Sequence, residues 1–83
     1  MPDISTKDIN SYLKSKLETV RLDMMRGKAE ILLQALVADR IIFAADSHYL
    51  RNKELDRVGV RISYKVGAAD PTQNIEIYGN TSA

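Results

Sequence analysis

Ala29–Ala45, with the sequence AEILLQALVADRIIFAA, is the segment that decides the fold of this 83-residue chain. Thirteen of its seventeen residues are apolar. On a helix, which turns by about 100° per residue, the polar residues point in separate directions; they are Glu30, Gln34, Asp39 and Arg40. A helix that is apolar on nearly every side has to be buried on nearly every side. The sequence therefore predicts a core helix over 29–45 that so short a chain cannot cover by itself.

The composition is that of one small globular domain spanning 1–83. Apolar residues make up 45% of the chain and charged residues 28%, which is typical of a folded protein. A domain of this size removes only about 60% of its unfolded surface from water, so its stability depends on a staple or a partner. The chain has no cysteine, which excludes a disulfide or a Cys-ligated zinc ion as the staple. Its net charge of +1 provides no general attraction to nucleic acids or acidic membranes.

The sequence contains no recognisable targeting segment. Its first residues, MPDISTKD, lack the apolar region of a signal peptide. The apolar segment 29–45 is shorter than the roughly 20 residues that a membrane span requires, and it contains Asp39 and Arg40. We therefore expect a chain that is neither secreted through a signal peptide nor transmembrane, and that is located in the cytoplasm or in a virion.

Ser5 and the apolar stripe that follows it predict an amphipathic first helix. Ser5 is an N-cap whose side chain can accept the backbone N–H of Asp8. The stripe advances in steps of three and four residues: Ile9, Leu13, Leu17, Val20 and Met24. Gly27 then favours a break or kink between two helices. Because the stripe continues in phase beyond Gly27, one long helix from 9 to 49, about 60 Å in length, is the open alternative.

The C-terminal part of the chain predicts an antiparallel β-hairpin. Residues 58–66 alternate between apolar and polar side chains, which is the pattern of a half-buried strand. A turn-rich loop over 67–73 leads to a second strand over 74–79, with Ile75 and Ile77 on its inner face. Two strands alone are marginally stable, so we expect their apolar side to pack on the helices or to pair with another chain.

The predicted fold class is therefore α+β, in which an N-terminal helical pair, or one long kinked helix, precedes the β-hairpin. Asp46 or Ser47 is a candidate N-cap for a short third helix over 48–56. The single domain is expected to consist of a helical part, a hairpin and a tail: 5–57, 58–79 and 80–83.

The sequence offers no convincing catalytic, metal or cofactor site. His48 is the only histidine, and Asp46-Ser47-His48 is the only cluster that resembles catalytic parts. Neighbours in sequence rarely adopt the geometry of a triad, so an N-cap followed by a surface histidine is the preferred interpretation. The four glycines are isolated, which excludes a P-loop or a dinucleotide-binding fingerprint. We expect a protein that is not an enzyme and that binds no cofactor, metal or small-molecule substrate.

Two groups of basic residues are candidates for phosphate binding. The first is concentrated between residues 51 and 65: Arg51, Arg57, Arg61 and Lys65. The second recurs every seven residues along one flank of the first helix: Lys7, Lys14, Arg21 and Lys28. A solvated face, whose charges discourage strand-edge aggregation, is the preferred interpretation of both groups. A small dimeric nucleic-acid-binding regulator that uses segment 51–65 is therefore an alternative function.

The apolar segment favours a non-enzymatic assembly protein, which acts as a homo-oligomer subunit or within a larger protein complex such as a phage-type viral particle. The residues expected at the interface are the large apolar ones of the central helix and the second strand: Ile31, Leu32, Leu36, Ile42, Phe43, Ile75 and Ile77. A second alternative is an inhibitor or adaptor that offers the edge of strand 74–79 to a partner sheet.

Overall fold

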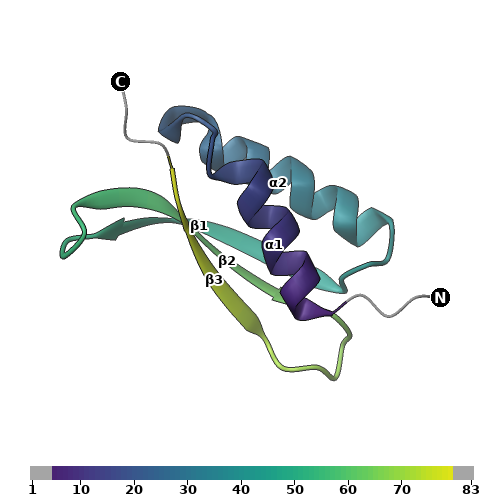
Figure 1. The fold of residues 1–83 in the computed structure, drawn as a ribbon. Helices are drawn as coiled ribbons and strands as arrows, with labels where there is room; N and C mark the ends of the chain where they lie inside the picture. The colour runs from purple at the N-terminus through teal and green to yellow at the C-terminus, as the bar shows by residue number, and fades with distance from the viewer. Residues whose placement is uncertain (1–4, 80–83) are drawn as a thin grey trace.

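The structure is a computed structural model that describes residues 5–79, in which two helices precede a three-stranded antiparallel sheet (Figure 1). The strands follow one another in the order β1-β2-β3. The elements are α1 (Thr6–Leu17), α2 (Leu22–Ala38), β1 (Ala44–Asn52), β2 (Arg57–Lys65) and β3 (Gln73–Tyr78). The predicted α+β class is confirmed, with three strands where a hairpin was expected. The expected tail 80–83 lies outside the described residues.

Helix α1 forms as the sequence predicts. The side chain of Ser5 accepts the backbone N–H of Asp8 at 3.2 Å, which satisfies one of the free amides at the start of the helix. The residues that α1 buries are Ile9, Leu13 and Leu17, the first three members of the predicted stripe. The apolar stripe therefore attaches α1 to the core.

The break between the helices lies at residues 18–21, so the prediction of a break at Gly27 is wrong. Thr19 and Val20 are β-branched and favour helix weakly, and Arg21 has an extended backbone at the start of α2. Gly27 lies inside α2, where a Cβ atom would meet no other atom within 4 Å. One glycine costs a helix only about 1 kcal/mol relative to alanine, which the flanking residues can tolerate.

The central helix ends at Ala38, seven residues before the predicted end. Arg40 has a left-handed backbone with φ of 61°. The N–H of Arg40 bonds to the carbonyl of Val37 at 3.0 Å, and the N–H of Ile41 bonds to that of Leu36 at 2.9 Å. This pair of hydrogen bonds is a Schellman motif, which usually has glycine in the left-handed position. Because arginine occupies that position here, no local sequence signal marks the end of the helix.

The predicted third helix over 48–56 is wrong, since most of this segment belongs to β1 and the turn after it. Asp46 and Ser47 are strand residues and cap no helix. Residues 44–52 pair with residues 57–65 of β2 in an unbroken antiparallel register. The predicted helical part therefore ends at Ala38, and the sheet begins at Ala44.

The two predicted strands are confirmed as β2 and β3, each displaced by one residue. Their apolar sides face the helices and form the core. Helix α2 packs against β1 and β2, while α1 packs against α2 and β3. Figure 1 shows both helices on the same face of the sheet. The fully buried strand residues are Val60, Ile62, Tyr64 and Ile77.

Tyr64 connects the central strand to the first helix. Its hydroxyl group lies 2.6 Å from Oδ1 of Asn10 and 3.2 Å from the carbonyl oxygen of Thr6, both in α1. Burial raises the pKa of the Tyr64 hydroxyl above its usual value, because the charged phenolate would lose its hydration. The polar end of this core residue is thus satisfied by the start of α1.

Two glycine substitutions should change stability in opposite directions. Gly27→Ala should raise the free energy of unfolding by about 0.5–1 kcal/mol, because the site is open and lies in a helix. Gly59→Ala should lower it by about 1–3 kcal/mol or more. A Cβ atom at Gly59 would overlap with the carbonyl oxygen of Ile77, a backbone atom that cannot rotate away. Urea unfolding measures both values, and equal stability of the two variants would contradict this packing.

Candidate functional site

The face of the sheet that the helices leave open carries a row of hydrogen-bonded polar side chains. His48, Arg61 and Glu76 lie side by side on β1, β2 and β3. The guanidinium of Arg61 donates to Glu76 at 3.0 Å, and the hydroxyl of Tyr78 donates to the other carboxylate oxygen at 2.7 Å. Hydrogen bonds from Tyr78 and then Arg61 lower the pKa of Glu76. The row therefore satisfies most of its own charges.

The four candidate phosphate contacts are only partly brought together: Arg51 and Arg61 line one hollow of about 370 Å³ with Lys53, and Glu54 and Glu76 line it as well. Strand alternation places Arg57, Arg61 and Lys65 on the open face, whereas Arg51 lies on the opposite side of the sheet. Arg57 donates to the carbonyl oxygen of Gly79 at 2.8 Å, and Arg61 is paired with a carboxylate. Two of the three cations on the open face are thus already engaged within the chain.

The predicted basic flank of the first helix is divided by the break at 18–21. Lys7 and Lys14 belong to α1, Arg21 lies at the break, and Lys28 belongs to α2. A hollow of about 560 Å³ between α1 and β3 does bring one member of each basic set together, Lys14 and Arg57. Two carboxylates also line it, those of Glu18 and Glu76, so its charges balance.

His48 has one polar partner on the open face. Its Nε2 atom lies 2.8 Å from Oδ2 of Asp46, and both side chains are exposed. Ser47, the third residue of this sequence cluster, points to the opposite side of the strand. Within residues 5–79, no group of three or more histidine, aspartate or glutamate side chains could hold a metal ion. The cluster is therefore a surface pair and not a triad.

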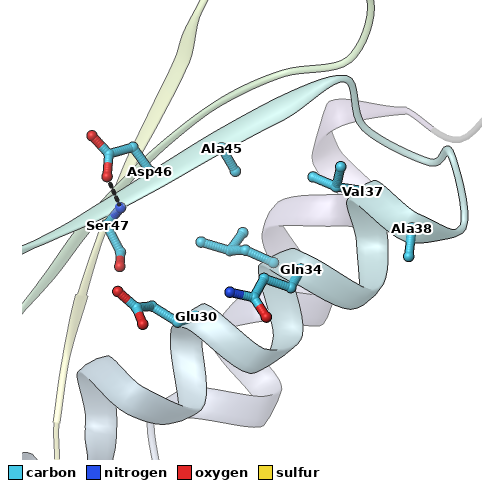
Figure 2. Close-up of a pocket in the computed structure, with 8 residues that line it drawn as sticks. Glu30, Gln34, Val37, Ala38, Ala45, Asp46 and Ser47 are labelled. Carbon is cyan, nitrogen blue, oxygen red and sulfur yellow. Dashed lines mark hydrogen bonds between the residues drawn. The ribbon is translucent and has the colours of Figure 1, made fainter.

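A groove of about 380 Å³ lies between α2 and β1 (Figure 2). Leu33, Val37, Ala38 and Ala45 form its apolar lining, while Glu30, Gln34, Asp46 and Ser47 contribute polar atoms. Figure 2 shows Ala45 and Ser47 directed toward the helix, with Glu30 and Gln34 on the opposite wall. The groove thus combines an apolar floor with the carboxylate of Glu30 and two neutral polar groups, while Asp46 borders it with its carboxylate on the other side of β1.

Ser47 is the unusual residue in this groove. It is only 3% exposed, and its hydroxyl oxygen has no hydrogen-bond partner within residues 5–79. Its backbone N–H donates to Oδ1 of Asp46 at 2.9 Å, which is the dashed line in Figure 2. A buried hydroxyl without a partner costs about 1–3 kcal/mol. The groove therefore contains an unused polar group, which the sequence-based interpretation of Ser47 as a helix cap missed.

The seven residues predicted at an interface occupy three environments. Leu36, Ile42 and Ile77 are buried in the chain's own core, and Leu32 and Ile75 are half-buried against it. The three buried residues are enclosed by the chain itself, while Leu32 and Ile75 keep part of their surface exposed. Ile31 and Phe43 are 67% and 57% exposed.

Comparison with known proteins finds no matching family model, no matching curated relative and no matching solved structure. Within the described part of the chain, neither helix combines the length and apolar character that crossing a membrane requires.

Replacement of Tyr78 by phenylalanine should raise the pKa of Glu76 toward its usual value, because the carboxylate loses the hydrogen bond that lowers it most. A carboxyl group with a lowered pKa stabilises the fold above the unfolded-state pKa, and this contribution disappears as the pH falls through the folded-state pKa. An NMR titration of the Glu76 carboxyl group measures the change. Tyr12→Phe, on α1, is the control that should leave the pKa of Glu76 unaltered, and equal titrations in all three proteins would exclude the proposed cause.

Proposed function

We propose that this chain is a non-enzymatic subunit of a protein assembly and that it associates with further copies through the side formed by α2 and β1. The observation that carries the proposal is the distribution of exposed large apolar side chains. Within residues 5–79, seven such side chains are exposed. Five belong to α2, β1 and the segment between them, which we call the α2–β1 side: Met24, Ile31, Val37, Phe43 and Tyr49.

The other two exposed apolar residues are separated from this side. Tyr12 belongs to α1, and Leu55 lies in the turn between β1 and β2. Full burial of a large apolar side chain contributes about 1.5–3 kcal/mol, so five of them could supply a substantial part of an association energy. Exposed large apolar residues that gather on neighbouring elements are typical of interaction sites, and α2 and β1 are in contact.

Helix α2 supports the proposal because two of the five residues share one stripe of it. Met24 and Ile31 are seven residues apart, so they lie above one another on the helix, on the side away from the buried residues Met25, Ala29 and Leu33. A helix that buries one side in its own core and exposes large apolar residues on the other is suited to packing between two partners.

Nucleic-acid binding receives less support. The open face of the sheet carries three cations, but two of them bond to groups of the chain itself. The hollow that joins Lys14 and Arg57 also contains two carboxylates. Phosphate binding depends on unpaired positive charge. The groove beside β1 is lined by acidic residues and by no basic residue among those described, so it favours a partner that carries a cation over a nucleic acid.

Light scattering at several protein concentrations tests the proposal. The wild-type protein should have a mass of at least twice the 9.3 kDa of one chain. Ile31→Glu should lower this mass, or association should require a higher protein concentration than in the wild type. The reason is that burying an unpaired carboxylate in an apolar contact is unfavourable. Tyr12→Glu, at an exposed site on α1, is the matched control and should behave like the wild type. A mass of 9.3 kDa at every concentration would overturn the proposed self-association.

A further inference from the structure

Strand β1 is an outer strand with a long unpaired edge. It has nine residues and pairs with β2 on one side only, and no other strand of residues 5–79 lies on its second side. Unpaired strand edges of this length are templates for pairing with another chain unless they are blocked. The residues of β1 include no proline, and the groove beside α2 opens next to it.

The backbone register identifies the groups that the free edge offers. The N–H of Gly79 donates to the carbonyl of Val58 at 3.2 Å, so the even-numbered residues of β2 bond to β3. Alternate residues of an antiparallel strand bond to opposite neighbours. The odd-numbered residues of β2 therefore bond to the even-numbered residues of β1. The N–H and C=O groups that remain at the free edge belong to Ala45, Ser47, Tyr49 and Arg51.

The two halves of this edge differ in shape and charge. Around Ala45 and Ser47 the edge is hollow, and the groove there contains the unpartnered hydroxyl of Ser47 and the carboxylate of Glu30. Asp46 borders the groove, but its carboxylate lies toward the open face, where it contacts His48. None of the described residues that line the groove is basic. Around Tyr49 and Arg51 the edge protrudes, because Tyr49 is 58% exposed and Arg51 is exposed as well. The guanidinium of Arg26 lies 5.4 Å from the centroid of the Tyr49 ring, and Arg51 forms only a long, exposed ion pair of 3.9 Å with Asp56. One half of the edge is thus a hollow lined by acidic residues, and the other presents an aromatic ring and a cation.

All four of these residues lie on the side of β1 that faces the helices, since they pair with inner-face residues of β2. A two-fold axis through the middle residue of the strand, His48, would place the protruding half of one copy against the hollow half of another. Isologous contacts have this property, because each copy supplies both complementary surfaces. This register also pairs all nine residues of the strand.

We propose that the occupant of the free edge and groove is β1 of a second copy, paired antiparallel about His48 into a continuous six-stranded sheet. Tyr49 of the second copy lies opposite Ser47, and its Arg51 lies opposite Ala45. The ring of Tyr49 enters the groove beside the Ser47 hydroxyl, and the guanidinium of Arg51 brings a cation to the helix-facing side of the edge, where Glu30 lines the groove. This proposal rests on the proposed self-association and specifies the part of the contact that β1 makes.

The hydrogen bond between Asp46 and the N–H of Ser47 fits this pairing. In the single chain, the carboxylate of Asp46 accepts a hydrogen bond from the Ser47 N–H, a donor at the free edge that would otherwise bond only to water. In the pair, this N–H donates to the carbonyl of Tyr49 in the second copy, and Asp46 keeps its contact with His48 through Oδ2. Each copy thus exchanges a local hydrogen bond for a bond of the β-ladder.

Single cysteines test the register without interference, because the chain has none of its own. His48→Cys places the two sulfur atoms at a non-hydrogen-bonded pair on the two-fold axis, where Cα atoms lie about 4.5 Å apart, within the range of a disulfide. Mild oxidation should shift the chain from 9.3 kDa to twice that mass in non-reducing electrophoresis. Reduction should restore the monomer band.

Asp46→Cys and Leu50→Cys are the matched controls on the same face of the same strand. In the proposed register, residue 46 of one copy lies four residues along the strand from residue 46 of the other, a distance of about 13 Å. The same holds for residue 50, so neither variant should cross-link alone. A mixture of the two variants should cross-link, because residue 46 of one copy lies opposite residue 50 of the other. This mixture also tests the register independently if His48→Cys disturbs folding.

The outcomes separate the two proposals. Cross-linking of His48→Cys and of the mixture, but of neither control alone, supports the pairing about His48. An oligomer in light scattering without this cross-linking pattern overturns the pairing and leaves the proposed self-association intact. Efficient cross-linking of either control alone also overturns it, because it requires another register. A wild-type protein of 9.3 kDa at every concentration overturns both proposals.

Discussion

The packing of two short helices on one face of the sheet is the interaction on which the rest of the structure depends. Leu13 and Leu17 of α1, together with Met25 of α2, share one core with Val60 and Ile62 of the central strand. These two helices are the only helices in the described part of the chain, and they lie on the same face. The second face of the sheet and the outer strand edges therefore have to remain stable in contact with water or with a partner.

The open face of the sheet and the α2–β1 side differ in how their exposed side chains are satisfied. On the open face, cross-strand hydrogen bonds join Arg61, Glu76 and Tyr78, so that charged and polar groups satisfy one another. Such pairs stabilise a sheet and leave little free charge for a ligand. On the α2–β1 side, large apolar residues are exposed and a buried hydroxyl has no partner within residues 5–79. This contrast is why we place the interaction site on the second surface.

From the sequence, the assembly hypothesis depends on an apolar segment too large for so short a chain to bury, and the structure changes this physical basis. The segment 29–45 is divided between a helix, a turn and the beginning of a strand, so Leu33, Leu36 and Ile42 all reach the chain's own core. Less apolar surface remains exposed than a single helix would have presented. The apolar residues that remain exposed include Ile31 and Phe43. The structure adds a feature that the sequence did not indicate, which is the free edge of β1 with its acidic groove.

The sequence by itself determined the elements whose signals are local: the Ser5 cap, the apolar stripe of α1, and the alternation that marks β2 and β3. The tertiary structure alone decided the conformation of residues 39–52. The end of α2 depends on a left-handed backbone at Arg40, a residue type that does not mark such a position. Strand β1 has mixed polar residues without a clear alternation, and it is a strand because β2 supplies an edge for its backbone groups. The groove and the unpartnered Ser47 hydroxyl follow from that pairing, so no local pattern could have indicated them.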